Sequence, residues 1–352
     1  IRMAVRLGDW HCYAGAIHIH TTESDGTKTL EEVVSLGREV GLDFMMFSDH
    51  MTLSNREMGK EGFYGDTLVT VGYEHNDADD IHHYLLFDSP RVYPSDMSAA
   101  EYVKAGAADG ALGFLAHPDE IRNKLKSYPP YPWKDWSVDG FTGIELWNQM
   151  SEWMEKLTRY NMLVNACSPR KWMVGPTDRI LKKWDELNMT RKVVGFASVD
   201  AHAFSAKVGP LKVEIFPYKV HFKTLRSYIL LPEEMSRDFN TARDQLYQAL
   251  RDCRLYFANV RWGAADEFEF YIKSGDQTTV SGGQIKASAD ARLVVNLPER
   301  ATLKLIHNGQ YTLQANTDRL ELDRLDPGLY RVEAWKGKRG WIFSNHIRVE
   351  SE

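Results

Sequence analysis

Two histidines separated by one residue, His18 and His20, open the segment HIHTTESDG, and their side chains suit metal binding. On an extended chain, alternate side chains point to the same face, so we expect the two imidazoles to lie together. Asp25 follows in a turn-prone Ser-Asp-Gly that can bring its carboxylate back toward them. Imidazole and carboxylate together suit zinc, manganese or iron. Taken alone, however, the pair is equally compatible with a packed strand surface.

Histidine and acidic side chains recur at short apolar runs further along the chain. Most stand at or just beyond the carboxyl end of a run, where a parallel barrel collects its active site, although His18, His20 and His83 fall within predicted strands. Scattered structural histidines would not share this location. We therefore predict one metal site with nine ligands: His18, His20, Asp25, His50, Glu74, His83, His117, Asp200 and His202.

The adjacent pair His82 and His83 leaves one of these ligands ambiguous. Neighbouring side chains on a strand point to opposite faces, so at most one of the two enters the site. His83 leads directly into the apolar run Tyr84–Phe87, and we prefer it, with His82 as the alternative.

The first half of the chain alternates apolar strands with amphipathic helices, which is typical of a parallel α/β architecture. Thr29 and Glu32 form a capping box before the first helix, and Gly41 stands where a helix commonly ends. The predicted strands that lead to candidate ligands or contain them are 42–47, 68–72, 83–87, 111–116, 143–147 and 193–198.

The sequence pattern changes near Asp266, where short predicted strands with alternating apolar and polar residues replace the helices. Turn signals such as Asn308-Gly309 and Asp326-Pro327-Gly328 separate these strands. We therefore predict two domains, a catalytic domain over 1–264 and an Ig-like antiparallel β-sandwich over 265–352. The helix expected near 241–251 would close the first of them.

Composition excludes several classes of protein. Of the 352 residues, 43% are hydrophobic and 26% charged, which describes a folded globular chain, and no apolar stretch is long enough to span a bilayer. A net charge of −6 argues against nucleic acid as the main partner. Three widely spaced cysteines, Cys12, Cys167 and Cys253, imply no disulfide framework and favour a reducing compartment. We expect a cytoplasmic protein, with secretion as the alternative because the chain begins at Ile1.

The order and spacing of these motifs resemble the PHP (polymerase and histidinol phosphatase) family over about residues 12 to 260. The motifs are HIHTTESDG, FSDH ending at His50, GYEH with Glu74, AHPDE with His117, and SVDAH with Asp200 and His202. The resemblance implies an α/β fold, a distorted (β/α)7 barrel that holds up to three divalent metals. The appended sandwich, with Trp341–Asn345 near its end, looks like the carbaryl-hydrolase branch of metallohydrolases.

The resemblance also implies a role for each predicted ligand. His18, His20 and Asp200 would bind one metal, and Glu74 would bridge it to a second metal held by His83 and His117. Asp25, His50 and His202 would form a third site. We expect Glu74, Asp200 and His202 to take part in catalysis.

Three other residues near these motifs, Asp49, Glu145 and Asn148, are expected to support the site. Asp49 is a plausible partner that orients a ligand, as metal-bound imidazoles usually require. Glu145 and Asn148 are expected to be structural or to support the ligands without binding metal. Arg191, Lys192 and Lys207 could help to bind an anionic substrate, although such residues are more commonly just solvated at the surface.

The predicted chemistry is hydrolysis by hydroxide. Two ions about 3.5–4 Å apart can share a water and lower its pKa toward 7, and the cations stabilise charge that develops on the substrate. Because three metals would carry too much charge for a neutral ligand, we expect a small phosphate monoester or diester as substrate. The aromatic segment 128–136 could offer a stacking wall to a leaving group, although packing alone is its simpler role.

Two alternatives remain beside the phosphoesterase. The same metal centre could hydrolyse a carbamate, ester or amide, as the resemblance to carbaryl hydrolases suggests. Alternatively, the chain is not an enzyme but a binding module whose barrel serves as a scaffold. A proofreading nuclease is disfavoured by the acidic charge. The sequence leaves open the oligomeric state, the metal identity and the physiological substrate.

Overall fold

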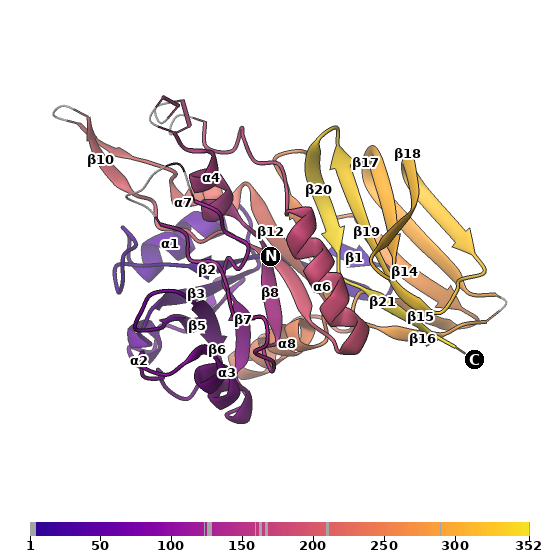
Figure 1. The fold of residues 1–352 in the computed structure, drawn as a ribbon, viewed down its shortest axis with the longest axis horizontal. Helices are drawn as coiled ribbons and strands as arrows, with labels where there is room; N and C mark the ends of the chain where they lie inside the picture. The colour runs from indigo at the N-terminus through magenta and orange to yellow at the C-terminus, as the bar shows by residue number, and fades with distance from the viewer. Residues whose placement is uncertain are drawn as a thin grey trace. The chain divides into compact units, whose positions relative to one another are not determined.

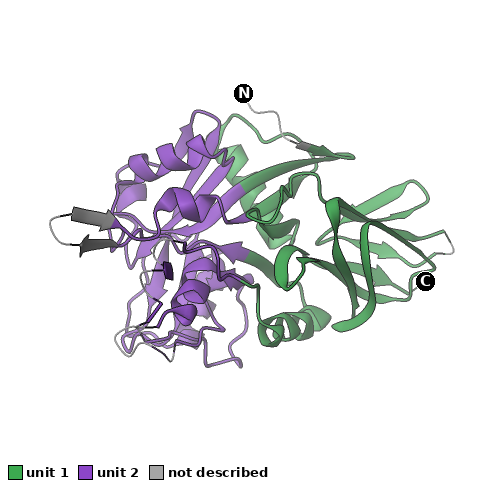
Figure 2. Cartoon of the chain, turned by 90° about the horizontal axis from the view of Figure 1, so that it is seen from above, with its two compact units in different colours: residues 1–14, 174–196, 227–352 green, residues 15–173, 197–226 purple. Residues whose placement is uncertain are grey.

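The computed structural model describes residues 5–122, 124, 129–158, 160–161, 164–165, 168–208, 211–288 and 290–351, and it describes no side chain at residue 5 or over 205–213. Cys167 and the side chain of Lys207 therefore lie outside the described part. The chain forms two compact units, unit 1 with residues 1–14, 174–196 and 227–352 and unit 2 with residues 15–173 and 197–226 (Figure 2). The predicted division between residues 264 and 265 stays a prediction.

Unit 2 holds the elements that carry the candidate ligands (Figure 1). Its helices are α1 (Leu30–Glu39), α2 (Ser54–Glu57), α3 (Ala99–Ala108), α4 (Gln149–Lys156) and α7 (Tyr218–Phe222). Its strands are β3 (Phe44–His50), β4 (Gly62–Tyr64), β5 (Thr67–Asn76), β6 (His83–Phe87), β7 (Leu112–Leu115), β8 (Gly143–Asn148), β10 (Ser205–Val208) and β11 (Leu211–Glu214). Strands β2 (Trp10–Ile19), β9 (Val194–Ser198) and β12 (Leu225–Leu231) include residues of both units.

Helix α1 begins and ends where the sequence predicts. The backbone N–H of Glu32 donates to Thr29 Oγ1 (3.4 Å), and the N–H of Thr29 donates to the Glu32 carboxylate (2.8 Å), which completes the capping box. Beyond the helix, Gly41 has φ +75° and donates to the carbonyl of Arg38 (3.0 Å). A left-handed residue of this kind satisfies the last carbonyls of a helix, and glycine adopts it without strain.

The strands of unit 2 are mixed in direction, which corrects the expectation of a parallel arrangement. β2, β3 and β5 are parallel, and so are β7 and β8, but β6 runs antiparallel to both β5 and β7. The reason is the link between β5 and β6, residues 77–82, which is too short for the crossover that parallel neighbours require.

The fold is mixed α/β, with one large sheet of 19 strands among the described residues and a separate pair, β10–β11. The predicted (β/α)7 barrel is not confirmed, because this sheet is not closed. Its central run follows the order β2-β3-β5-β6-β7-β8, and the reversed strand β6 interrupts the β/α alternation that a barrel repeats.

Unit 1 is dominated by antiparallel strands. It contains β1 (Val5–Leu7), α6 (Asp178–Thr190), α8 (Phe239–Arg251), β13 (Leu255–Asn259), β14 (Glu269–Ser274), β15 (Gln277–Val280), β16 (Gln284–Lys286), β17 (Arg292–His307), β18 (Gln310–Asp323), β19 (Gly328–Lys336), β20 (Arg339–Ser344) and β21 (Ile347–Glu350). The predicted sandwich of two sheets is not confirmed, because β17 pairs with β14 over its first half and with β19 over its second half. One continuous 16-residue strand thus pairs with both β14 and β19 within the same sheet.

A buried ion group fixes α6 to the strands of unit 1. Arg331 donates two hydrogen bonds to Asp185 (2.6 and 2.8 Å) and a third to Glu333 (2.7 Å), and His346 Nε2 lies 2.7 Å from Asp185. Burial by itself raises the pKa of Asp185, but the hydrogen bonds from Arg331 and His346 outweigh it and lower this pKa to about 2. All four side chains are buried, so loss of the Arg331 guanidinium would leave two buried carboxylates, Asp185 and Glu333, without their cation.

Two of the three cysteines are described, and both Cys12 and Cys253 are buried and in no disulfide among the described residues. Among the described residues, no helix combines the length and the hydropathy that a membrane span requires.

Candidate metal centre

The pairing of strands β3, β5 and β6 in unit 2 brings candidate ligands to the same edge of the sheet. In the parallel pair β3–β5, His50 lies opposite Glu74. In the antiparallel pair β5–β6, His83 lies opposite Asn76, two residues beyond Glu74 and therefore on the same face of β5. Because β6 is reversed, its first residue, His83, stands at the edge where β3 and β5 end.

Three candidate ligands have a left-handed backbone, which is uncommon for residues other than glycine. They are His18 (φ 69°), His117 (φ 29°) and Asp200 (φ 47°). The β2–β3 register shifts at His18, so the premise of an extended HxH segment is wrong at this position. The imidazoles of His18 and His20 nevertheless meet, with ring centroids 4.9 Å apart, because the irregularity re-aims the first ring.

The carboxylate of Glu74 is the centre of the cluster, and its two oxygens face different histidines. Oε2 lies 2.9 Å from His18 Nε2 and 3.3 Å from His20 Nε2. Oε1 lies 2.8 Å from His83 Nδ1 and 3.2 Å from His117 Nε2. The side chain is 1% exposed. A buried carboxylate in this position is suited to bridge two cations.

A second carboxylate, Asp200, lies beside the first two histidines. Its Oδ1 is 3.4 Å from Nε2 of both His18 and His20, and 3.5 Å from His202 Nδ1. These contacts agree with the expectation that His18, His20 and Asp200 surround one position.

The outer part of the cluster gathers around Asp25. Its carboxylate lies 3.2 Å from His202 Nε2, 3.6 Å from His20 Nδ1 and 3.8 Å from His50 Nε2. His20 thus has one ring nitrogen toward Asp25 and the other toward Glu74, whereas the predicted third site contained only Asp25, His50 and His202. An ion here would share the ring of His20 with the inner group.

The nine predicted ligands all belong to unit 2, and eight of them fall into three overlapping groups that could each hold an ion. The groups are His18, His20 and Glu74; Glu74, His83 and His117; and His20, Asp25, His50 and His202. Within each group the ligand atoms lie within 4.8 Å of one another. Imidazole with carboxylate suits zinc, manganese or iron, so the residues fit a divalent metal.

The charges in the cluster show that it favours positive charge. Burial lowers the pKa of His18, but Glu145, Asp200 and Glu74 outweigh this effect and raise it well above the ordinary value. The same balance raises the pKa of His20 to about 9, through Asp200 and Glu74. Burial raises the pKa of Glu74 and Asp200, yet the neighbouring histidines hold both well below the ordinary value. The carboxylates that stabilise protonated histidines here would also stabilise bound metal cations.

Residues around the ligands hold them in orientation. Glu145 Oε1 lies 2.6 Å from His18 Nδ1, and its Oε2 accepts from the backbone N–H of His117 (2.7 Å). Asn148 donates to Glu145 (3.0 Å) and to Asp200 (3.2 Å). Both therefore support ligands, as carboxylates behind metal-binding imidazoles commonly do.

Asp49 acts differently from our expectation. Its carboxylate accepts from the N–H and hydroxyl of Thr21 (2.6 and 2.7 Å), from Ser24 (2.8 Å) and from Asn55 (3.0 Å). It therefore fixes the loop between His20 and Asp25 and does not orient an imidazole directly.

The adjacent histidines, His82 and His83, face different neighbours. His82 Nδ1 lies 2.9 Å from Asp77 Oδ2, and its ring packs against Trp133, 4.8 Å between centroids. His83 instead faces Glu74. Trp133 is buried, so this part of segment 128–136 serves packing, while Tyr128 lies outside the described residues.

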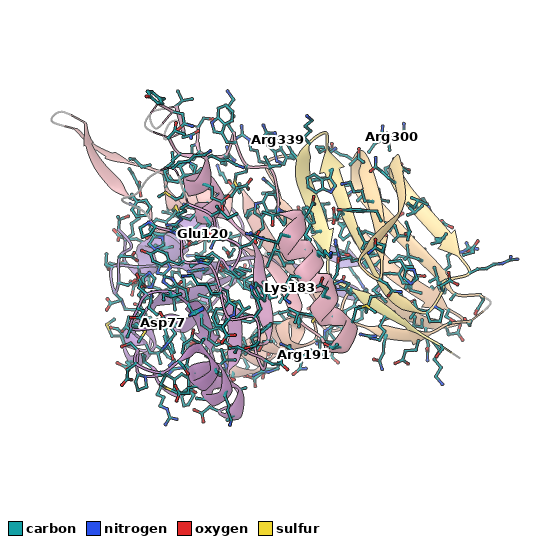
Figure 3. All side chains as sticks on the ribbon, viewed as in Figure 1. Asp77, Glu120, Lys183, Arg191, Arg300 and Arg339 are labelled. Carbon is teal, nitrogen blue, oxygen red and sulfur yellow. The ribbon has the colours of Figure 1, made fainter. Side chains whose placement is uncertain are left out.

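Sequence reasoning missed the neighbours of His83. Asp80 Oδ1 lies 2.9 Å from His83 Nε2, and the ring of Tyr131 stacks on His83 at 4.7 Å. The guanidinium of Arg122 lies over the Tyr131 ring, 5.9 Å from its centroid, and pairs with Glu120. Figure 3 labels Glu120. The acidic segment 76–80 was the signal that could have revealed Asp80, whereas Arg122 gave none.

Of the three basic residues that we nominated, Arg191 and Lys192 have described side chains, whereas that of Lys207 lies outside the described part. Arg191 and Lys192 follow α6 and belong to unit 1, where Figure 3 labels Arg191.

No protein-family model matches the chain, and no curated protein matches its sequence. Among solved structures, a two-domain protein from Bacteroides vulgatus, which contains a predicted PHP-like metal-dependent phosphoesterase, covers 98% of this chain and 99% of its own, with 12% identity and a TM-score of 0.48. A proposed metal-dependent phosphoesterase from Bifidobacterium adolescentis covers 66% of this chain and 96% of its own, with 15% identity and a TM-score of 0.33. At these levels of likeness, function has to be argued from the site.

Proposed function

We propose that the protein is a metal-dependent phosphoesterase of PHP type that hydrolyses a small phosphate monoester or diester. The observation that carries the proposal is the position of Glu74, whose two oxygens face two separate pairs of histidines at 2.8–3.3 Å. Shared carboxylates of this kind join neighbouring cations. When bound, such ions lower the pKa of water toward 7 and stabilise negative charge on the ester.

The charge of the cluster favours an anionic substrate. Three divalent ions would bring six positive charges, against the three carboxylates of Asp25, Glu74 and Asp200 among the nine ligands. Excess positive charge in a partly enclosed site attracts a phosphate and stabilises it further as charge develops. Arg122 adds a guanidinium near the Tyr131–His83 stack.

The chain's own residues would hold and orient the reacting groups. Glu145 and Asn148 fix His18 and Asp200, so their atoms need little rearrangement. Asp200 and His202 stand beside the inner and outer groups, where they could accept or return a proton during hydrolysis.

A carbamate, ester or amide hydrolase of the carbaryl-hydrolase kind is the rival proposal, since the same centre serves either electrophile. Steady-state assays of the zinc- or manganese-loaded protein with p-nitrophenyl phosphate, bis-p-nitrophenyl phosphate and 1-naphthyl carbamate distinguish the two. We expect phosphate turnover to dominate and to disappear on chelation. Carbamate turnover far above both phosphates would reverse the order.

Metal analysis separates both enzymes from a non-catalytic module. After add-back and removal of free ions, we expect two or three ions per chain. Fewer than one ion per chain would favour the binding module instead.

A further inference from the structure

A stack of three rings leads from the centre of the metal cluster to the solvent. The ring of His202 lies on that of His20, with centroids 4.0 Å apart and planes 17° apart. The ring of Phe204 is in turn nearly parallel to that of His202, with centroids 5.6 Å apart and planes 6° apart. Phe204 is 38% exposed, whereas His20 and His202 are buried. The stack therefore ends in a phenylalanine that is open to solvent.

The backbone holds Phe204 firmly in this position. Thr27 donates its N–H to the carbonyl of His202 (3.2 Å) and its hydroxyl to that of Ala203 (2.8 Å). The carbonyl of Phe204 accepts from the N–H of Ile215 (2.6 Å). Ala203 has φ +55°, an unfavourable backbone for alanine that these anchors maintain. A large apolar ring is thus kept at the surface next to the site.

We propose that Phe204 determines specificity by stacking on a flat aromatic group of the substrate. The inference rests on the proposed phosphoesterase activity and adds the class of leaving group. A second ring on Phe204 would bury its exposed area and extend the parallel stack, an arrangement that aromatic pairs favour. Because Phe204 lies one ring beyond His202 from the cluster, the aromatic group must be separated from the ester by a short spacer.

Two esters with the same type of leaving alcohol test this proposal, 3-phenylpropyl phosphate and 3-cyclohexylpropyl phosphate. They differ in the flat π-face and share the primary alkoxide, so the ratio of their kcat/KM values reports stacking. We expect Phe204→Leu to lower the ratio of phenyl to cyclohexyl ester about five- to tenfold, and Phe204→Trp to keep it. Tyr311→Leu, which removes an exposed aromatic ring of unit 1, should leave it unchanged.

The outcome separates this inference from the proposed function. An unchanged ratio in Phe204→Leu, with metal content equal to the wild type, would overturn the role of Phe204 while turnover still supported the phosphoesterase. If the metal-loaded wild type hydrolyses neither these two esters nor the p-nitrophenyl phosphates, the proposed function fails. Calorimetric binding of 4-phenylbutylphosphonate and 4-cyclohexylbutylphosphonate then decides the stacking proposal: preference for the phenyl compound that Phe204→Leu removes supports it, and equal affinities refute it.

Discussion

Replacing Glu74 by glutamine keeps the shape of the side chain but removes its negative charge. Nitrogens of His18, His83 and His117 lie 2.8–3.2 Å from this carboxylate, so ions held by these rings would also be its close neighbours. At an effective dielectric constant of about 20, two unit charges about 3 Å apart interact by roughly 5.5 kcal/mol. Half of that, to allow for lost hydration, is about 2.7 kcal/mol, or about a hundredfold in ion affinity.

The measurement is equilibrium dialysis of Glu74→Gln against a series of free zinc or manganese concentrations, with bound metal counted by mass spectrometry. We expect at least one ion fewer per chain at concentrations that saturate the wild type, and loss of phosphate-ester turnover. Glu152→Gln is the matched control, because Glu152 is a buried glutamate of the same unit that accepts from the Trp147 indole. Equal ion number and affinity in Glu74→Gln and wild type would refute the bridging role.

Three further predictions concern ligand choice, charge and helix capping. His83→Ala should lose bound metal while His82→Ala keeps it in the same dialysis assay; the reverse result would assign the site to His82. Asp185→Asn should lower the free energy of unfolding at pH 7 by about 2–3 kcal/mol, measured by urea denaturation, because it removes the carboxylate that accepts two of the three hydrogen bonds from Arg331. The folded pKa of Asp185, about 2, lies below the ordinary 3.8, so its stabilisation, roughly 2 kcal/mol, is complete above about pH 4 and lost as the pH falls toward 2. Asp185→Asn should lack this acid dependence, and an unchanged slope would contradict the assignment. Thr29→Ala should weaken α1 by about 1 kcal/mol, seen as faster hydrogen exchange of its first turn; unchanged exchange would show that the cap is dispensable.

The sequence was sufficient to predict helices and strands whose ends depend on residues near them in the chain. The capping box and Gly41 fixed both ends of α1, and the apolar run 83–87 matched β6 residue for residue. The alternation of short strands and turns also indicated the antiparallel character of unit 1.

Features that depend on pairing between distant segments were beyond this reasoning. The reversed direction of β6 was missed because pairing extends β5 to Asn76, beyond the predicted strand 68–72, and so shortens the link to β6. The irregularity at His18 depends on the register with β3. Strand β18 was missed because it is largely exposed and lacks a clear apolar face. The pairing of Arg331 with Asp185 joins positions 146 residues apart, which no local pattern reveals.

The candidate ligands were found because their residue types are costly to bury without partners, and the motifs place them at strand ends. Their division among ions was harder, since it depends on which ring nitrogen faces which carboxylate. His20 illustrates this, because its two nitrogens face different carboxylates.

The left-handed backbone at His18, His117 and Asp200 has a consequence for how the centre is assembled. Each such conformation costs on the order of 1–3 kcal/mol, which the surrounding fold of unit 2 must offset. Folding of the chain therefore orients these side chains before an ion binds. In a zinc finger, by contrast, the arriving ion organises a disordered chain.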